Sequence, residues 1–188
     1  MILAIDVGNT NLVLALGSEA GSVDSVWRIS TDAVTSADAC SKAIRKTLGT
    51  KLEEVDNSVI ASVVPAITRH VATAMEGVTG RAPLVVGESG VDLGIAVNID
   101  RPEQAGADRV VNAVGAQVHH QLPAVILDFG TATTLDLVGA DGAYEGGIIA
   151  PGVALSIEAL ERAAAQLPKL ELRALSLIHI SEPTRHCL

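Results

Sequence analysis

Aromatic residues are almost absent from this 188-residue chain, which has one Trp, one Tyr and one Phe. Its hydrophobic core must therefore be built from Val, Ile, Leu and Ala. Hydrophobic residues make up 48% of the sequence and charged residues 19%, a balance typical of a packed globular protein rather than a disordered chain. The length is enough for one large domain or two small ones.

Basic residues are also scarce. The chain has 13 Lys and Arg against 22 Asp and Glu, a formal net charge of −9. Nucleic-acid binding depends on clustered Lys and Arg, so we expect no nucleic-acid partner. ATP is not excluded, because a phosphate group can be held by a few backbone amides and a metal ion.

Cysteine and long apolar runs are lacking as well. The two cysteines, Cys40 and Cys187, predict neither a disulfide framework nor a metal site. No apolar run approaches the ~18 residues that a membrane span requires, and no basic region precedes Asp6 as it would in a signal peptide. We therefore expect a cytoplasmic protein with no membrane partner.

What the sequence does contain is a strand–turn–strand pattern at its start. Apolar residues 2–5 end at Asp6, residues 7–11 form a polar turn, and a second apolar run covers residues 12–16. Gly8 would let a ligand approach the backbone, and consecutive amides could form an anion-binding nest. Asp6 could hold Mg²⁺ or its water shell. A plain β-hairpin uses the same residue types, so this stretch alone leaves both interpretations open.

The same pattern returns 122 residues later. Residues 124–128 are an apolar run ending at Asp128, Gly130 follows as Gly8 follows Asp6, and another apolar run comes after the turn. Two such modules predict an α/β fold of two duplicated domains that face each other across a cleft. The layout resembles the actin and sugar-kinase ATPase superfamily (ribonuclease H-like domains with mixed sheets), in which both turns grip nucleotide phosphates.

The remaining elements follow from local signals. Further strands are expected at residues 22–29, 57–64, 83–86, 133–138 and 143–149, and helices at 36–48, from Pro65 to about 77, and at 153–166. Asp100 with Glu103 predicts a capping box that starts a helix running to about residue 120. On that helix, Val110, Val111, Val114 and Val118 form one apolar face. Domains are expected at residues 1–121 and 122–174.

Three stretches taken together are more specific than any one of them: residues 6–11, 106–109 and 128–133. With the Gly-rich residues 146–152 and Leu155-Ser156, they closely resemble the type III pantothenate kinase family, in the right order over residues 1 to about 172.

This resemblance implies a role for each matching residue. It implies ATP binding by Asp6, Val7, Gly8, Asn9, Thr10, Asn11, Leu12, Val13 and Thr131. It implies pantothenate binding by Gly106, Ala107, Asp108 and Arg109, with Asp108 as the catalytic proton acceptor. Asp128 matches the ligand of a monovalent cation, K⁺ or NH₄⁺, and Asp6 is the candidate ligand of the Mg²⁺ that accompanies ATP. A homodimer is implied for the full-length protein.

These roles agree with the chemistry of phosphoryl transfer, which needs positioning, charge neutralisation and a carboxylate to accept the hydroxyl proton. Arg109 has the two-pronged geometry that suits a planar carboxylate such as that of pantothenate. Without the resemblance, however, a neighbouring Asp–Arg pair is more often a solvated surface pair. Asp128 could simply end a strand. Asp136, Asp141 and Glu145 are expected to face solvent, and His119-His120 to form a polar helix end.

Two other functions remain open at this point. One is a non-catalytic regulatory relative on the same fold, because the family also contains proteins first described as accessory transcription factors. The other is a superfamily kinase that acts on a sugar or an acid, against which the match at residues 106–109 argues.

The end of the sequence departs from the family. Residues 175–188 share no pattern with it and resemble a translated sequencing adapter, so Thr184, His186 and Cys187 receive no role. We expect a C-terminally truncated chain whose second domain is incomplete and whose activity is an open question. Apolar surface on the second sheet and on the 153–166 helix should then be exposed, which favours aggregation.

Overall fold

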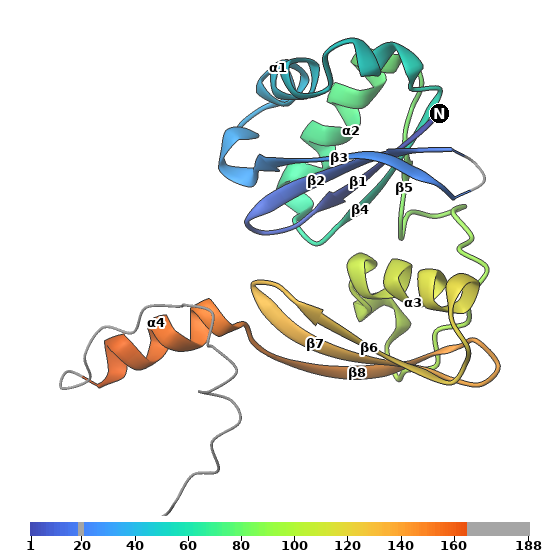
Figure 1. Ribbon diagram of the computed structural model, residues 1–188, viewed down its shortest axis with the longest axis vertical. Helices are drawn as coiled ribbons and strands as arrows, with labels where there is room; N and C mark the ends of the chain where they lie inside the picture. Colours follow the sequence, from blue (N-terminus) through green and yellow to red (C-terminus); the bar gives the residue numbers. More distant parts are fainter. Residues whose placement is uncertain (19–20, 165–188) are drawn as a thin grey trace, which may run out of the picture.

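The computed structural model describes residues 1–18 and 21–164, which form an α/β fold with two sheets (Figure 1). The first sheet has five strands in the order β3-β2-β1-β4-β5, and the second has three in the order β6-β7-β8. The expected tail at residues 175–188 lies outside the described residues. Within the described part of the chain, no helix is long and apolar enough to cross a membrane.

The first sheet is mixed. Its strands are β1 (Ile2–Val7), β2 (Asn11–Gly17), β3 (Val23–Ser30), β4 (Asn57–Ser62) and β5 (Leu84–Val85). The first three form an antiparallel meander, whereas β4 runs parallel to β1 and β5 parallel to β4. Leu3, Ile5 and Val7 alternate with Ala4 and Asp6, so one face of β1 is buried in the core and the other is exposed.

Two helices, α1 (Ala37–Leu48) and α2 (Pro65–Thr79), lie on the buried face of this sheet (Figure 1). The Ser36 hydroxyl accepts a hydrogen bond from the Ala39 amide at 3.1 Å and caps α1. Gly49, at φ 54°, ends that helix where the sequence predicts. Pro65 occupies the first turn of α2, which continues two residues beyond the predicted end.

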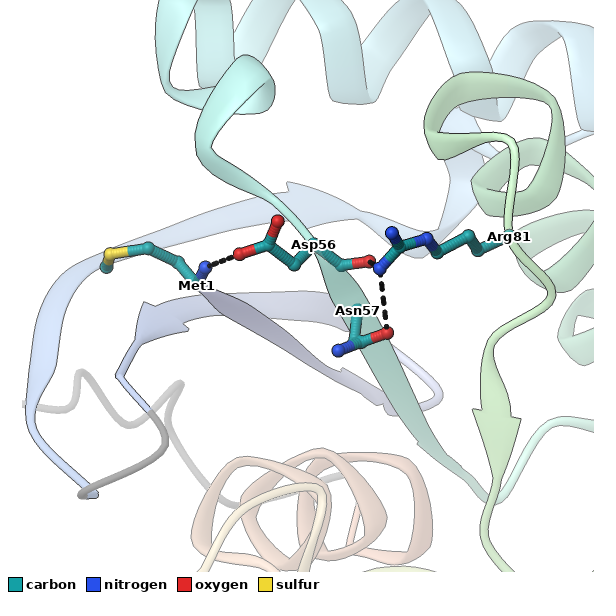
Figure 2. Close-up of polar contacts among 4 residues, drawn as sticks. All are labelled: Met1, Asp56, Asn57 and Arg81. Carbon is teal, nitrogen blue, oxygen red and sulfur yellow. Dashed lines mark hydrogen bonds and ion pairs between the residues drawn. The ribbon is translucent and has the colours of Figure 1, made fainter.

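Polar contacts fasten the far end of the first sheet (Figure 2). The N-terminal ammonium of Met1 donates to Asp56 Oδ2 at 2.5 Å, and Arg81 Nη1 donates to the carbonyl of Asp56 at 2.9 Å. The same Arg81 nitrogen reaches Asn57 Oδ1 at 3.5 Å. The hydrogen bond and charge of the ammonium lower the pKa of Asp56. These contacts tie the starts of β1 and β4 to the segment after α2.

The second sheet consists of β6 (Ala124–Phe129), β7 (Ala132–Val138) and β8 (Tyr144–Pro151), followed by α4 (Val153–Ala163). It repeats the antiparallel meander of β1, β2 and β3. The expectation of a mixed second sheet does not hold for the described residues, whose three strands are all antiparallel.

Helix α3 (Ala107–His119) lies between the two sheets (Figure 1). It packs on the second one, where Ala113 and Ala116 join Val138 and Tyr144 in a buried cluster. The hydrophobic core under the first sheet is a separate cluster, and among the described residues its last member is Val85. By packing, α3 therefore belongs with the second core, and the domain boundary expected after residue 121 stays a prediction.

The start of α3 corrects one prediction. No helix begins at Asp100: residues Pro102–Gln104 form a separate 3₁₀ turn without a side-chain cap, and α3 starts after Gly106. The expected capping box is therefore wrong. The expected valine face is also wrong in part, because the buried residues are Val110, Ala113 and Ala116 whereas Val118 is exposed.

The second sheet has an exposed apolar face, as the sequence predicts. This outer face consists of side chains that the strand register places on the side away from α3, each 36% to 68% exposed: Val125, Leu127, Phe129, Leu135, Leu137 and Ile148. Helix α4 likewise has no fully buried residue.

Candidate active site

The two hairpin turns singled out by the sequence meet in the structure. The first (residues 8–10) joins β1 to β2, and the second (residues 130–131) joins β6 to β7 (Figure 1). Thr10 Oγ1 and Thr131 Oγ1 lie 3.1 Å apart, within hydrogen-bond distance, although 121 residues separate them. One hydroxyl from each sheet therefore lines a common position.

The first hairpin turn is held by a hydrogen bond of its own and by Thr31, the residue directly after β3. The Gly8 amide donates to the Asn11 carbonyl at 3.0 Å, so it closes the turn and is not a free member of the anion nest that the sequence suggests. The Thr31 hydroxyl donates to the Gly8 carbonyl at 2.8 Å, and its amide donates to the carbonyl of Thr10 at 3.0 Å. Sequence reasoning misses Thr31, because nothing local marks it as the partner of Gly8, 23 residues earlier in the chain.

The predicted ATP-binding residues of this segment divide by exposure. Asn9, Thr10 and Asn11 are exposed and offer polar side chains, whereas the side chains of Val7 and Leu12 are buried in the core. Val7 and Leu12 could therefore meet a ligand only through their backbone.

The second hairpin turn rests on the start of α4. The Gly130 amide donates to the Ala132 carbonyl at 2.9 Å, and the Gly152 amide donates to the Thr131 carbonyl at 3.0 Å. A Cβ at position 152 would lie 2.3 Å from the Gly130 carbonyl oxygen, so only glycine fits this contact. The positive end of the α4 dipole consequently lies beside Thr131, a location that favours an anion.

Three carboxylates from three elements gather near these turns. Asp6 and Asp128 are the next-to-last residues of β1 and β6, and Asp108 is in the first turn of α3. Partial burial raises the pKa of Asp6, and the negative charges of Asp108 and Asp128 raise it further. The structure thus brings the three predicted site carboxylates into one electrostatic neighbourhood.

Asp108 is positioned by its immediate sequence. Its Oδ1 accepts a hydrogen bond from the Arg109 amide at 2.8 Å. A Cβ at position 106 would lie 2.5 Å from this oxygen, so Gly106 leaves room for the carboxylate to fold back over the helix start. The N-terminal end of a helix also favours a negative charge.

The charge of this neighbourhood fits a bound cation. Its carboxylate oxygens are the ligands that hard cations prefer, and a cation would relieve the repulsion that raises the pKa of Asp6. No group of three His, Cys, Asp or Glu residues in the described chain is close enough to form a metal site by itself. Any metal here would therefore share its coordination with phosphate oxygens or water.

Arg109 has a partner that the sequence did not predict. Its Nε donates to Asp136 Oδ1 at 2.7 Å, and its Nη2 lies 2.5 Å from the same oxygen. Tyr144 donates its hydroxyl to this oxygen at 2.8 Å. Burial raises the pKa of Tyr144, and the contact with Asp136 adds to the effect, to about 12.

The prediction that Asp136 faces solvent is therefore wrong, because this residue is 0% exposed. Its neighbours Leu135 and Leu137 are the exposed residues of β7, because α3 covers the side of the strand on which Asp136 lies. Asp141 and Glu145 are exposed as predicted, and His119 and His120 form an exposed helix end.

Two cavities lie beside α3, one at Arg109 and the other at Asp128. One of about 440 Å³ is lined by Arg109, Tyr144 and Gly147 together with Arg101 and Gln104. Another of about 670 Å³ lies between α3 and β6, from His119 to Asp128. Both flank the helix that carries Asp108.

Comparison with known proteins places this geometry in context. The family model described as type III pantothenate kinase matches residues 2–188. The chain is 46% identical over 175 residues to the type III pantothenate kinase of Paramagnetospirillum magneticum and 45% identical over 175 residues to that of Rhodospirillum centenum. In both cases the alignment covers 92% of this chain and 67% of the relative, so the chain spans about two thirds of their length.

A solved structure shares the fold. It is described as a candidate Baf family transcriptional activator from Campylobacter jejuni, with a TM-score of 0.54 and 18% sequence identity. The likeness covers 93% of this chain and 67% of that one. At this identity it informs on architecture alone.

Proposed function

Because the chain belongs to the type III pantothenate kinase family, we propose that it transfers the γ-phosphoryl group of ATP to the primary hydroxyl of pantothenate. The product is 4'-phosphopantothenate, and the reaction is the first step of coenzyme A biosynthesis. The observation that carries this proposal is the meeting of Thr10 with Thr131 beside Asp6, Asp108 and Asp128.

The two hairpin turns would bind the phosphates of ATP. Asn9, Thr10, Asn11 and Thr131 supply neutral hydrogen-bond groups, and the N-terminus of α4 supplies a partial positive charge next to Thr131. Neither turn contains Lys or Arg, so the side chains of the two turns would contribute hydrogen bonds but no positive charge. Charge neutralisation would then fall to cations.

Asp108 would accept the proton of the attacking hydroxyl. In a loose phosphoryl-transfer transition state the proton leaves late, so a carboxylate can serve as its acceptor. Asp6 would hold Mg²⁺ and Asp128 a monovalent cation, K⁺ or NH₄⁺; when bound, these ions would neutralise charge that develops on the phosphates. Gly106, Ala107 and Arg109 would complete the pantothenate segment around Asp108.

The fold proposal goes further than the α/β class. The antiparallel meander that the two sheets share supports two duplicated actin- and sugar-kinase-like domains. The boundary near residue 121 and an incomplete second domain stay predictions, and the packing of α3 on the second sheet favours an earlier boundary. The homodimer and the cytoplasmic location are supported by the family resemblance alone.

The regulatory alternative has less support. The description of the Campylobacter jejuni protein as a transcriptional activator concerns that protein, which shares only the fold with this chain. The net charge of −9 also offers little to a nucleic-acid partner.

The test is ATP-dependent phosphorylation of pantothenate in the presence of Mg²⁺ and K⁺. It should be run on this chain and on a version extended to the length of the relatives. Asp108→Asn should lower kcat by about 10²- to 10⁴-fold, the usual contribution of a general base. Asp141→Asn, the same change at an exposed site, should leave kcat unaltered. Full activity of Asp108→Asn would remove Asp108 as the proton acceptor.

A further inference from the structure

One buried ion pair connects the helix that carries Asp108 with the strand that follows Thr131. Arg109 is the neighbour of Asp108 in the first turn of α3, and its guanidinium crosses to Asp136 on β7. Because β7 begins at Ala132, directly after the second hairpin turn, the pair spans from the proposed proton acceptor to the proposed ATP-binding turn. No other ion pair in the described residues joins α3 to either sheet.

The sheet is built to accommodate this pair. Asp136 Oδ1 accepts from Arg109 and from the Tyr144 hydroxyl, and the Arg109 guanidinium lies 5.8 Å from the centre of the Tyr144 ring. A Cβ at position 147 would lie 2.6 Å from Arg109 Nη2 and 2.7 Å from Asp136 Oδ1. The same Cβ would lie 2.0 Å from the Leu135 carbonyl oxygen, so glycine is required here by the neighbouring strand as well as by the ion pair.

Stability alone is a poor explanation for this arrangement. Burying two charges costs desolvation energy that their attraction only partly returns, and a well-packed apolar pair would often serve as well. Asp136 Oδ2 is also buried without a hydrogen-bond partner in the structure, which adds to that penalty. A buried pair of this kind specifies one orientation of the elements that it joins.

We propose that Asp136 and Tyr144 are positioning residues, which hold Arg109 and through it fix the first turn of α3 so that the Asp108 carboxylate stays at the position of the reacting hydroxyl. The inference rests on the proposed kinase function. Arg109 is in this view also an anchor within the protein, in addition to its proposed place in the pantothenate segment. Its Nε donates a hydrogen bond to Asp136, whereas Nη2 lies 2.5 Å from the same oxygen without a hydrogen-bond partner of its own.

The rival explanation is that the pair only orients Arg109 toward the pantothenate carboxylate and does not position Asp108. Pantothenol separates the two, because it keeps the reacting primary hydroxyl but replaces the carboxylate by an alcohol. An anchor affects both acceptors equally, whereas a carboxylate ligand matters only for pantothenate.

The experiment compares wild type, Asp136→Asn, Tyr144→Phe and the exposed control Asp141→Asn with both acceptors. Asp136→Asn should lower kcat by about 10- to 100-fold, the range expected for a small misplacement of a catalytic group. The factor should be the same for pantothenate and pantothenol, with the KM for ATP unchanged. Tyr144→Phe, which removes one hydrogen bond to a charged group, should lower kcat by about three- to tenfold. Asp141→Asn should behave as wild type.

A second readout does not depend on turnover. Hydrogen exchange should become faster at residues 107–110 in Asp136→Asn and Tyr144→Phe, but not at residues 57–62 of the first sheet. If the wild-type chain extended to the length of its relatives fails to phosphorylate either acceptor, the proposed function is wrong, while the exchange data still test the anchor. If Asp136→Asn does not fold, Tyr144→Phe decides.

Three results would overturn the positioning role. The first is unchanged kcat and unchanged exchange in the folded variants. The second is a loss seen with pantothenate but absent with pantothenol. The third is a rise in the KM for pantothenate at constant kcat, which would make the pair part of substrate binding.

Discussion

The two sheets start with the same antiparallel meander, yet one face of it is buried in the first sheet and exposed in the second. Ile5 on β1 is 2% exposed, whereas Leu127, which lies 122 residues later at the corresponding place on β6, is 50% exposed. Leu3 and Val125, and Val7 and Phe129, differ in the same way. Equal patterns of alternation have therefore led to opposite environments.

The difference lies in what covers each sheet. Helices α1 and α2 pack on the Ile5 side of the first sheet (Figure 1). On the second sheet, α3 packs on the opposite side, and no described residue covers the outer face. Alternating hydrophobicity thus predicts that a strand has an apolar face, but the covering element must be known before that face can be called core.

The largest effect should come from truncating the matched pair of core positions. Ile5→Ala should lower the free energy of unfolding by about 2–5 kcal/mol, since it creates a cavity in a closed core. Leu127→Ala should cost less than about 1 kcal/mol, because its side chain already contacts water. Urea unfolding measures both. Equal losses would mean that the outer face of the second sheet is covered in solution.

The glycines beside the two hairpin turns should respond unequally as well. A Cβ at Gly152 would lie 2.3 Å from the Gly130 carbonyl, whereas a Cβ at Gly8 would lie 3.2 Å from that of Asn11. Gly152→Ala should therefore weaken ATP binding by about tenfold or more through displacement of the second turn, and Gly8→Ala should have a smaller effect. ATP titration by calorimetry distinguishes them, and a larger loss at Gly8 would contradict the packing described.

Asp6, the carboxylate near Asp108 and Asp128, should make the folded protein less stable as the pH rises. The pKa of Asp6 is raised in the folded protein, so folding favours its protonated form. The stability that this group contributes is present at low pH and is lost as the pH rises through the raised pKa. Asp6→Asn should therefore raise the melting temperature of the ligand-free protein near neutral pH, by on the order of a degree for so exposed a group. A lower melting temperature would show that Asp6 is stabilised as the anion.

The smallest effect should come from Asp56, at the other end of the first sheet, where stability is lost as the pH falls. The ammonium of Met1 lowers the pKa of Asp56, so this stabilisation is present above the unfolded pKa and is lost as the pH falls through the folded value. Asp56→Asn should slightly destabilise the protein at neutral pH and flatten its loss of stability in acid. Acid unfolding of wild type and variant gives the comparison, and an unchanged acid limb would mean that the ion pair contributes nothing.

Local signals account for much of what the sequence predicted. Ser36 and Gly49 mark the ends of α1, and Asp6 and Asp128 lie in or at the end of their strands, because caps and strand ends depend on neighbouring residues. The helix start at Asp100 failed although its capping pattern is present, since the chain forms a 3₁₀ turn there and extends again at Gly106.

Long-range partners could not be predicted in this way. Arg109 and Asp136 are 27 residues apart, and their pairing depends on which side of β7 receives α3. Thr31 is likewise identified only by the turn that it supports. The missed features are those that tertiary packing decides.

If both sheets contribute to one nucleotide site, the affinity for ATP should depend on a hydroxyl from each hairpin turn. Calorimetry with Mg²⁺ present would measure this affinity for Thr10→Val and Thr131→Val. We expect each change to weaken binding by about tenfold, as for a lost hydrogen bond to a charged group, and the double variant to lose less than the two effects combined. Wild-type affinity in Thr131→Val would contradict this expectation, because the second sheet would then take no part in binding ATP.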